Sequence, residues 1–594
     1  MHAGARSPAF RTAGSILQEN SSRETFEGTM AMKAYILAYD IGTTGVKTCL
    51  FEVDEKIRLL KFASRSYPLY ILDDGGAEQD VEDWWRGMAE STREIFEACS
   101  GAGSDDSDNA TAETGAASGS APVNGQDAEP HITPDMISGI SFCSQMQGLV
   151  LVDRDGNALR RPMSYMDQRA RKEIRKGIAN GIQIAGANVT KLIPSLKITG
   201  AVAGSVKDPV WKYKWVEANE PDTFARIYKW LDVKDYLILR CTGSFTMTED
   251  EAFATFLYDI RPESRGWSDE MCELLGVRRE HMPDIIRSTE MAGRLTAKAA
   301  EDLGLAEGIP VYGGGGDSSL IGVGAGAVSI GDTHIYSGTS GWVTTVTDKQ
   351  MVDVTAMIAA IIGPERDKYN YFAEMETAGK CLEWVRDHLA LDEIGVYIKK
   401  EGVPSDYETR STSLYSHMTD VIKDVPPGSG GVIFTPWLHG NRCPFEDPDA
   451  KGMFFGIGLD TGKTEMIHAV LEGVFYHLRW MLECQDRRLK TSKRIRFVGG
   501  GALSPVSCQM LADITGRVIE TVDSPQNVGS VGACAVTAVG LGLISDLGRV
   551  KDFIPVSAVY TPDKDKNAAY KKYYKTFKKL YAANKQLFKS LAGK

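Results

Sequence analysis

Short apolar runs of strand length alternate with helical periodicity along most of the 594-residue chain. The runs that predict strands lie at residues 34–39, 140–143, 149–152, 311–312, 334–336 and 495–498. The clearest helical pattern follows Thr464, where apolar side chains recur every three or four residues over 466–481. Strands that alternate with helices predict an α/β fold in which helices cover sheets.

Three segments depart from this pattern. Residues 100–130 contain no aromatic residue, no Leu or Ile and no Lys or Arg, so we predict a disordered insertion in a surface loop. Residues 1–33 lack the apolar stretch of a secretory signal and predict a disordered N-terminal extension, with a transit peptide as the alternative. Residues 553–594 predict a helical tail, because aromatic residues recur at helical spacing among lysines over 570–581. Such a helix docks on a domain or, alternatively, lies on a membrane surface.

Composition excludes several classes of protein. Lys and Arg number 67 against 79 Asp and Glu, a net charge of −12 that argues against a nucleic-acid partner. The most apolar long segment, 309–328, is rich in Gly and interrupted by Asp317, so we predict no membrane span. The 10 cysteines include no CxxC pair, which is typical of reduced thiols in a cytoplasmic protein.

Two distant segments share one pattern, an apolar strand, a Gly-Thr-rich turn and a second strand. The first reads Tyr39-Asp40-Ile41-Gly42-Thr43-Thr44-Gly45-Val46-Lys47, and the second reads Ile335-Tyr336-Ser337-Gly338-Thr339-Ser340-Gly341-Trp342-Val343. The repetition predicts a duplicated domain whose halves face each other across a cleft.

A turn of this kind can aim several backbone N–H groups and hydroxyls at one anion, most often phosphate. Asp40 beside the first turn adds a carboxylate that suits Mg²⁺, so the pair of turns predicts a nucleotide-phosphate site; a plain hairpin is the alternative. Other phosphate motifs fail, because Ile457 stands where a P-loop ending at Gly462-Lys463-Thr464 needs glycine. The sequence has no G-x-S-x-G and no H-E-x-x-H motif.

Two further glycine-rich stretches follow predicted strands. Gly313–Gly316 lead into Asp317, a carboxylate that could accept a proton from an attacking hydroxyl or, alternatively, cap a helix that begins near Ser318. Gly499, Gly500, Gly501 and Ala502 follow the strand at 495–498 and could let an adenine or ribose lie against the backbone.

Together these stretches resemble the FGGY family of carbohydrate kinases in the actin-like ATPase superfamily, and within it the xylulokinase group. The most specific match is Gly452-Met453-Phe454-Phe455-Gly456-Ile457, followed after seven residues by Glu465-Met466 and Ala469-Val470-Leu471-Glu472. Supporting matches are Glu78-Gln79-Asp80, Trp84-Trp85, Pro209, Lys212, Trp215, Asp259, Arg442 and Pro444. The resemblance covers about residues 34–540 apart from the insertion.

The resemblance implies two actin-like (ribonuclease H-like) domains, at 34–326 and 327–552, flanking a deep cleft. It implies ATP-dependent transfer of the γ-phosphate to a hydroxyl of a ketopentose such as D-xylulose. Asp317 would be the catalytic base, and Asp40 would act with Mg²⁺. The residues implied to bind ATP are Gly42, Thr43, Thr44, Lys47, Gly338, Thr339, Ser340, Gly500, Gly501 and Ala502.

The implied sugar-binding residues are Met146, Gln147, Asp167, Arg169, Asp317 and Ser318. Two of them depart from the xylulokinase pattern, since Gln147 replaces the usual His and Ser318 the usual Asn. A kinase for glycerol, ribulose or a sugar acid such as gluconate is therefore an alternative, and so is a catalytically weak sugar or nucleotide sensor. No pattern sets the oligomeric state, so a homodimer stays open.

Overall fold

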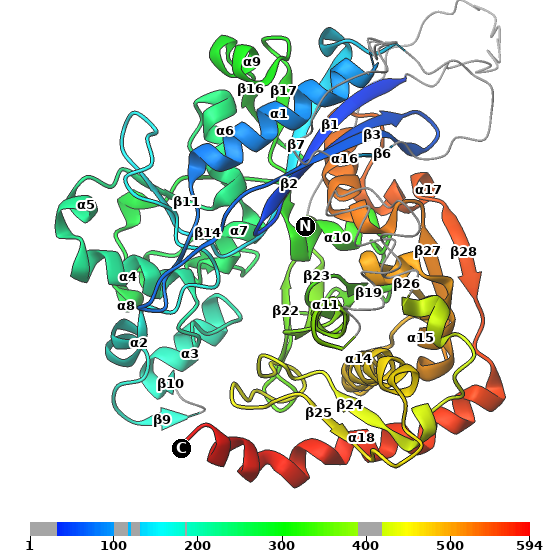
Figure 1. Cartoon of the computed structure of the whole chain (residues 1–594). Coiled ribbons are helices and arrows are strands. Elements are labelled where there is room, and N and C mark those ends of the chain that lie inside the picture. The colour runs from blue at the N-terminus through cyan, green and yellow to red at the C-terminus, as the bar shows by residue number, and fades with distance from the viewer. Residues whose placement is uncertain (1–32, 100–116, 120–130, 185–186, 390–417, 594) are drawn as a thin grey trace, which may run out of the picture. The chain divides into compact units, whose positions relative to one another are not determined.

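The computed structural model describes residues 33–99, 117–119, 131–184, 187–389 and 418–593 (Figure 1). The segments predicted to be disordered, 1–33 and 100–130, lie almost entirely outside these ranges. Within the second segment, β6 (Ala117–Gly119) is described and pairs with β3 (Ile57–Ser66).

The first large sheet has the order β16-β17-β7-β1-β2-β3-β6 in the described part of the chain, and β18 also pairs with β7. β1 (Ala34–Ile41), β2 (Gly45–Val53) and β3 form an antiparallel meander, and β7 (Ile137–Ser144) lies parallel to β1. The sheet is completed by β16 (Met291–Arg294), β17 (Pro310–Tyr312) and β18 (Gly315–Gly316). The strands predicted at 34–39, 140–143 and 311–312 are confirmed.

The second large sheet repeats this local arrangement. Its order is β21-β22-β23-β20-β19-β26-β27-β28. β19 (Thr333–Ser337) and β20 (Gly341–Thr347) form an antiparallel hairpin, and β26 (Arg494–Val498) lies parallel to β19 as β7 does to β1. The other strands are β21 (Val352–Asp353), β22 (Ile358–Ile362), β23 (Tyr369–Met375), β27 (Val518–Val522) and β28 (Val556–Tyr560). The strands predicted at 334–336 and 495–498 are confirmed.

Two helices, α10 (Asp317–Gly324) and α16 (Val528–Gly540), join the halves through one hydrophobic core that includes residues of β1, β20 and β26. Their backbones approach closely because glycines face the partner helix. A Cβ on Gly324 would lie 1.9 Å from the Val528 carbonyl oxygen, and one on Gly532 would lie 2.2 Å from the Leu320 carbonyl oxygen. Any larger side chain at either position would force the helices apart.

Several other helices pack on the large sheets, α1 (Val81–Cys99) on the first and α15 (Pro505–Thr515) on the second (Figure 1). α14 (Lys463–Asp486) confirms the helix predicted after Thr464, although burial continues around most of its circumference rather than along one face. Further α-helices in the described residues are α2 (Arg171–Gly177), α3 (Val189–Ile198), α4 (Pro209–Asn219), α5 (Pro221–Ala225), α6 (Val233–Thr242), α7 (Glu249–Ala254), α8 (Asp269–Leu275), α9 (Ala297–Leu303), α11 (Gly379–His388), α17 (Val550–Phe553) and α18 (Lys564–Leu591).

Six small two-stranded sheets lie beside the two large ones in the described residues. Their pairs are β4 (Tyr70–Ile71) with β5 (Ala77–Glu78), β8 (Val150–Val152) with β11 (Lys229–Leu231), β9 (Gln183–Ile184) with β10 (Ala187–Asn188), β12 (Thr246–Thr248) with β15 (Asp284–Ile286), and β13 (Tyr258–Asp259) with β14 (Gly266–Trp267). A sixth pair joins β24 (Ile433–Thr435) to β25 (Met453–Phe455) beside α14. β8 confirms the strand predicted at 149–152.

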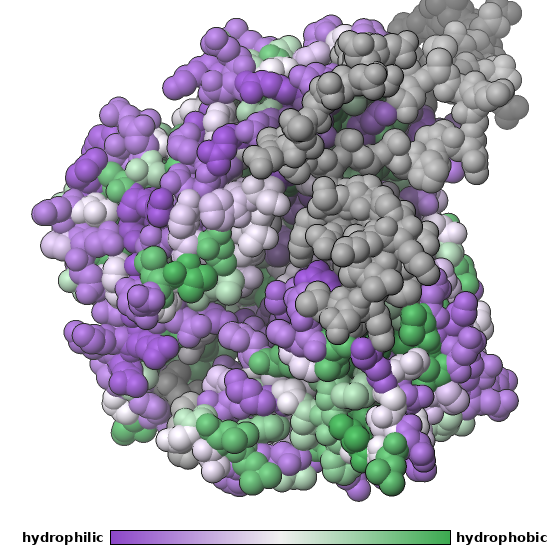
Figure 2. Space-filling model, in the orientation of Figure 1, coloured by the Kyte–Doolittle hydropathy of each residue, from purple (hydrophilic) through white to green (hydrophobic). Residues whose placement is uncertain are grey.

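The C-terminal helix α18 packs on the second half of the protein, as predicted, and Tyr570, Tyr574, Phe577 and Phe588 are buried in its core. The ring centroid of Trp437 lies 5.9 Å from those of Phe577 and Tyr581 and 6.2 Å from that of Phe588. The tail starts with a strand rather than a helix, because β28 pairs with β27 and ends the second sheet. No helix in the described ranges combines the length and apolar character needed to cross a bilayer. The face seen in Figure 2 is mostly hydrophilic, with apolar residues in separate patches.

Candidate active site

The two predicted catalytic carboxylates lie at the ends of β1 and β18, two strands of the first sheet that flank β7. Asp40 of β1 lies opposite Cys143 of β7, and Cys143 lies opposite Gly315 of β18, two residues before Asp317. Two strand spacings place these backbones about 10 Å apart. The Cys143 thiol hydrogen-bonds to the Asp40 carboxylate, and a Cβ on Gly529 at the start of α16 would lie 2.9 Å from Asp40 Oδ2.

Asp317 is held in an environment that favours its neutral form. Burial raises the pKa of its carboxyl group to about 7, the Asp40, Glu374 and Asp232 carboxylates add to the rise, and the Ser318 N–H opposes it. Asp317 is the first residue of α10, and its Oδ1 accepts the Ser318 N–H at 2.7 Å. The N-cap of α10 is Gly316, and Asp317 accepts only the N–H of the next residue, whereas a capping side chain accepts an N–H two or three residues further on. A pKa near 7 suits a general base at neutral pH.

The first glycine turn has its carbonyl groups tied to the surrounding protein. Tyr67 Oη donates to the Gly42 carbonyl at 2.6 Å, the Tyr67 N–H donates to the Thr44 carbonyl at 2.9 Å, and Gln79 Nε2 donates to the Thr43 carbonyl at 2.7 Å. No acceptor within the described ranges takes the backbone N–H of Thr43 or Thr44. Because its carbonyl oxygens already accept hydrogen bonds from the surrounding protein, the turn offers the N–H groups of Thr43 and Thr44 as donors. An anion binds to hydrogen-bond donors of this kind.

The second glycine turn is held in the same manner. The carbonyl groups of Gly338 and Thr339 accept N–H groups from the first turn of α11 and the residue before it at 2.7 and 3.0 Å. The Gly338 N–H donates to the Ser340 carbonyl at 3.0 Å, which closes the turn. These bonds fix the loop without a side chain at Gly338.

Tyr336 places the second turn beside the two carboxylates. A Cβ on Gly338 would lie only 2.1 Å from the Tyr336 hydroxyl oxygen, so this glycine leaves the room that the tyrosine occupies. Burial raises the pKa of Tyr336 far above its ordinary value, and the negative charges of Asp40 and Asp317 add to that rise. The second turn, Asp40 and Asp317 therefore share one electrostatic environment.

The glycine-rich stretch after β26 lies against the end of β19. A Cβ on Gly499 would lie 2.6 Å from the Ser337 carbonyl oxygen, and one on Gly501 would lie 2.8 Å from Ser337 Oγ. Ala502 is buried, whereas a Cβ on Gly500 would meet no atom within 4 Å. The structure thus brings this loop next to the second turn, with open space over Gly500.

The side chain of Lys47, a residue of the predicted phosphate site, points to the start of α16. It lies opposite Asp40 in the β1–β2 ladder. Its Nζ lies 3.4 Å from the Gln526 carbonyl oxygen and 3.5 Å from Asn527 Oδ1, so it reaches the loop that precedes α16. A phosphate contact from Lys47 stays a prediction.

Three predicted sugar-side residues lie together beside Asp317. Ser318 Oγ donates to Met146 Sδ at 2.9 Å. Gln147 has the positive φ of 62°, and its carbonyl group accepts a hydrogen bond from Lys212 Nζ at 2.6 Å. The loop that carries Met146 and Gln147 is therefore fixed through its backbone, which leaves the Gln147 amide for another role.

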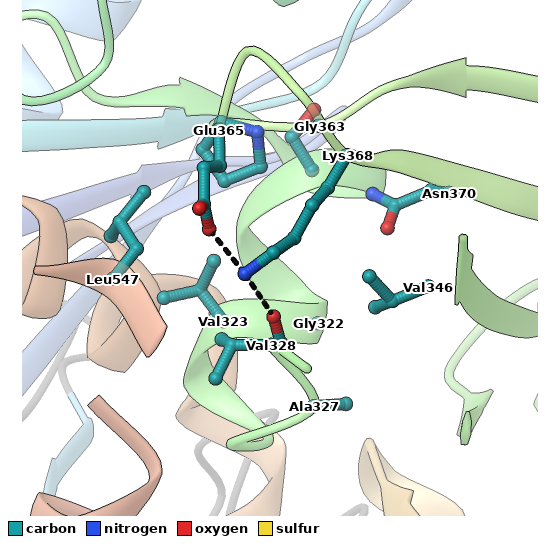
Figure 3. A pocket seen from close by; sticks show the side chains of 12 residues that line it. Gly322, Val323, Ala327, Val328, Val346, Gly363, Glu365, Lys368, Asn370 and Leu547 are labelled. Atoms are coloured by element: carbon teal, nitrogen blue, oxygen red, sulfur yellow. Dashed lines mark hydrogen bonds and ion pairs between the residues drawn. The ribbon is translucent and has the colours of Figure 1, made fainter. Parts of the chain in front are cut away.

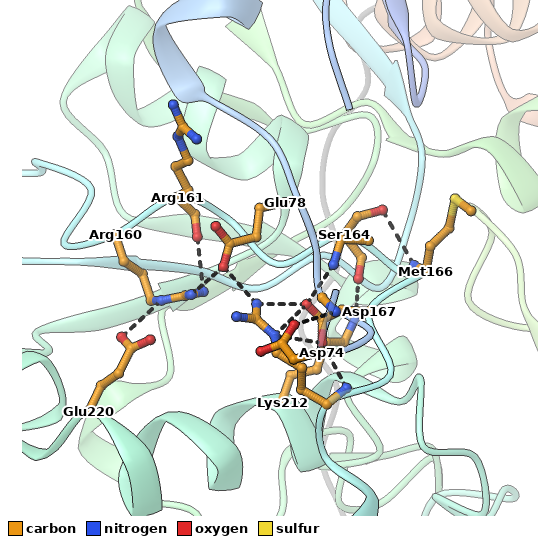
Figure 4. Close-up of polar contacts among 12 residues, drawn as sticks. Asp74, Glu78, Arg160, Arg161, Ser164, Met166, Asp167, Lys212 and Glu220 are labelled. Atoms are coloured by element: carbon orange, nitrogen blue, oxygen red, sulfur yellow. Dashed lines mark hydrogen bonds and ion pairs between the residues drawn. The ribbon is translucent and has the colours of Figure 1, made fainter. Parts of the chain in front are cut away.

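Asp167 and Arg169 bind each other, and Figure 4 shows Asp167 among the neighbouring polar groups, which include Glu78 and Lys212. Arg169 Nη2 lies 2.7 Å from Asp167 Oδ2 and 2.7 Å from Glu78 Oε1, and its guanidinium group stacks 4.5 Å from the Trp215 ring centroid. Asp167 is fully buried and also accepts the Ala77 N–H at 2.9 Å. These contacts indicate that the pair stabilises the protein next to the predicted sugar site. A direct contact of Asp167 or Arg169 with the sugar stays a prediction.

Residues outside the predicted set complete the surroundings of Asp317. Glu374 of β23 adds to its raised pKa, and Arg442 Nη1 lies 3.3 Å from Glu374 Oε2. The Tyr165 hydroxyl lies 3.4 Å from Thr43 Oγ1, and the Asp317 and Glu374 charges help to raise the pKa of this tyrosine. Arg442 belonged to a family motif, but nothing local in the sequence marked Glu374 or Tyr165.

Two cavities of the described residues lie away from the predicted site residues. The cavity in Figure 3 lies beside the later turns of α10, where Lys368 donates to Glu365 at 2.7 Å and to the Val328 carbonyl at 3.0 Å. At about 20 Å³ it has room for roughly one water molecule and not for a sugar. A wider hollow of about 580 Å³ at Trp267 and Arg279 contains none of the predicted site residues.

The described residues contain no cluster of three or more His, Cys, Asp or Glu that could hold a metal ion by itself. A magnesium ion needs no such cluster, since it commonly takes one or two carboxylates and completes its shell with phosphate oxygens and water. The metal-binding role of Asp40 stays a prediction.

The fold and the paired turns define a two-domain phosphotransferase of the actin-like type. Family models described as "FGGY family of carbohydrate kinases, N-terminal domain" and "C-terminal domain" match residues 35–324 and 334–541. The chain belongs to the FGGY family of carbohydrate kinases, which transfer phosphate from ATP to a hydroxyl acceptor, generally with a divalent metal. The exact domain boundaries at 34–326 and 327–552 stay a prediction.

Relatives with two different names are about equally similar. The xylulose kinase of Staphylococcus epidermidis is 25% identical over 94% of this chain and 98% of its own length, and the gluconokinase of Bacillus subtilis is 26% identical over 91% and 94%. Two solved Lactobacillus acidophilus structures, a xylulose kinase and a gluconate kinase, superpose with TM-scores of 0.74 and 0.73. Each is 22% identical; they cover 94% and 93% of this chain and 100% and 98% of their own. The structural likeness confirms the fold class.

Proposed function

We propose that this chain transfers the γ-phosphate of ATP to a hydroxyl of a neutral ketopentose such as D-xylulose. The observation that carries the proposal is the convergence of two donor-presenting glycine turns, Asp40 and a partly exposed Asp317 with a pKa of about 7. A sensor has no use for a proton acceptor in this position, so the arrangement supports catalysis.

In the proposed mechanism, Asp317 accepts the proton of the sugar hydroxyl as its oxygen bonds to the γ-phosphorus. The bond between that phosphorus and the β–γ bridging oxygen breaks, and ADP leaves. The N–H groups of Thr43 and Thr44 and the second turn at 338–340 orient the phosphates. Mg²⁺ held by Asp40 would neutralise charge that develops on the phosphate oxygens.

Charge around Asp317 favours a neutral sugar over a sugar acid. Asp40, Glu374 and Asp232 all raise its pKa, and Arg442 is paired with Glu374. The carboxylate of a sugar acid would lie close to these negatively charged side chains, and the repulsion between like charges is unfavourable in a partly buried site. The second candidate function, a gluconate kinase, rests on Arg442, whose guanidinium group could turn from Glu374 to a substrate carboxylate.

The test is ADP release by the purified chain with Mg²⁺-ATP and a panel of D-xylulose, ribulose, glycerol and gluconate. We expect the highest kcat/KM with D-xylulose. Glu374→Gln removes one negative charge and should therefore raise the kcat/KM for gluconate relative to that for D-xylulose. Gluconate as the best substrate of the unmodified chain would overturn the choice of a neutral sugar. Tight sugar binding with no ADP release for any compound would favour the sensor.

A further inference from the structure

Two adjacent acidic residues, Asp250 and Glu251, lie buried in α7 behind the acceptor side of the site. Their exposed fractions are 2% and 0%. Neither was part of the predicted site, and the proposed mechanism assigns them no step. Burying two carboxyl groups is costly unless specific contacts compensate, so their contacts indicate what they do.

Asp250 holds the turn that carries Asp317. Its Oδ2 accepts the Gly316 N–H at 2.8 Å, immediately before Asp317. A Cβ on Gly315 would lie 2.9 Å from the same oxygen, so the glycine is what admits the carboxylate. Asp250 thereby connects α7 directly to the backbone from which the proposed base projects.

Glu251 acts on the sugar-side loop through Asp232. Asp232 Oδ1 accepts the Gly148 N–H at 2.8 Å, one residue after Gln147. Glu251 is hydrogen-bonded to Asp232, yet no described donor reaches either Glu251 oxygen. A bond between two carboxyl groups needs a shared proton.

The charges that face Glu251 indicate where that proton lies. Burial raises its pKa well above the ordinary value, and the Asp232, Asp250 and Asp235 carboxylates add to the rise, whereas Lys234 opposes it. Lys234 is itself hydrogen-bonded to Asp235. Burial raises the pKa of Asp232 as well, but the Val233 and Gly148 N–H groups and the Lys212 charge oppose that rise, so we assign the shared proton to Glu251, which donates to Asp232.

We propose that Asp250 and Glu251 are positioning residues that fix the Asp317 turn and the Met146–Gln147 loop relative to each other. One rigid helix end holds both parts of the acceptor site, the first through the Gly316 amide and the second through Asp232 and the Gly148 amide. The expected changes in kcat and KM rest on the proposed function, whereas the expected changes in hydrogen exchange do not.

The test compares Asp250→Ala, Asp250→Asn, Glu251→Leu and Glu251→Gln with Thr248→Val, which removes a buried hydroxyl that has no described partner. Asp250→Ala should lower kcat about 100-fold, because a small displacement of a catalytic group has costs of this order. Asp250→Asn, which keeps an acceptor oxygen, should recover most of the rate. Glu251→Leu should raise the KM for sugar about 10-fold, and Glu251→Gln, whose amide donates without a shared proton, should restore it. The KM for ATP should stay unchanged in all variants.

Amide hydrogen exchange of peptides spanning 146–150 and 313–319 supplies a readout that needs no turnover. Asp250→Ala should speed exchange at Gly316, and Glu251→Leu at Gly148, while Thr248→Val changes neither. Unchanged exchange, or kcat and both KM values equal to those of Thr248→Val, would overturn the proposal. If Asp250→Ala does not fold, Asp250→Ser replaces it in the same assays. A panel without any active sugar, together with the expected exchange changes, would refute the proposed function and leave the positioning role supported.

Discussion

Replacing Asp317 with Asn separates the two roles open to this residue. Asn keeps an oxygen that can accept the Ser318 N–H, now 2.7 Å from Asp317 Oδ1, but it cannot accept a proton from the sugar. A residue that only caps α10 would therefore tolerate the change. A general base would not, and kcat should fall by about 10²–10⁴-fold.

The pKa of about 7 predicts a specific pH dependence for the unmodified chain. Only the carboxylate form accepts a proton, so kcat/KM should fall about tenfold for each pH unit below 7 and level off above it. The residual rate of Asp317→Asn should lack this limb.

The same pKa has a consequence for stability. A rise from 3.8 to about 7 means that the native state binds this proton more tightly than the unfolded state does. The unmodified protein therefore loses stability as the pH rises from about 4 through 7, by about 4 kcal/mol at full burial and about 1–2 kcal/mol for this partly exposed side chain. Ligand-free Asp317→Asn should exceed the unmodified protein in stability by that amount above pH 7, and the difference should vanish below pH 4.

The assay is ADP release with the best sugar of the panel from pH 5.5 to 9, together with thermal unfolding of both proteins. ATP binding, measured by calorimetry, serves as the control and should be largely unchanged. A variant that retains a third or more of the normal rate, or that keeps the acid limb, would refute the assignment of Asp317 as the base.

Two further substitutions test the nucleotide side and the tail. Gly338→Ala brings a Cβ to 2.1 Å from the Tyr336 hydroxyl, so it should lower stability by about 1–3 kcal/mol and raise the KM for ATP. Gly500→Ala adds a Cβ that meets no atom within 4 Å, so it should raise the KM for ATP without changing the melting temperature. A normal KM for ATP in both variants would show that the nucleotide does not bind at these two loops. Phe577→Ala, at a fully buried site in α18, should cost about 3–5 kcal/mol in chemical denaturation, against less than about 0.5 for the exposed Leu587→Ala; equal costs would show that α18 is not part of the core.

Local pattern was sufficient for the elements that carry the site. The alternation at 34–39 and 334–336 and the glycines after each run predicted two equivalent hairpins, which the structure has as β1–β2 and β19–β20. A turn of this kind is determined by backbone conformations that a few adjacent residues dictate. The amphipathic pattern over 570–581 likewise predicted a docked helix, which is α18.

Long-range contacts were beyond such reasoning. Glu374 looks like an outward polar residue of a strand, yet it faces Arg442 and influences Asp317 because β23 lies two strands from β19 in the second sheet. Nothing in the local sequence marks Asp250 and Glu251 as buried, because it is tertiary packing that covers both side chains. The circumferential burial of α14 was missed for the same reason, since which neighbours cover a helix is not encoded in its own periodicity.

The ladder from Asp40 through Cys143 to Gly315 gives the two carboxylates a common foundation. Backbone hydrogen bonds join all three strands, so Asp40 and the turn before Asp317 move as one body. The second turn and the Gly500 loop belong to the other sheet. Any rotation between the halves would therefore change the distance from the donors of the second turn to Asp317, but not the spacing of Asp317, Asp40 and the first turn. In the proposed mechanism, such a rotation would adjust how the second turn approaches a phosphate that the first half already holds beside the proposed base.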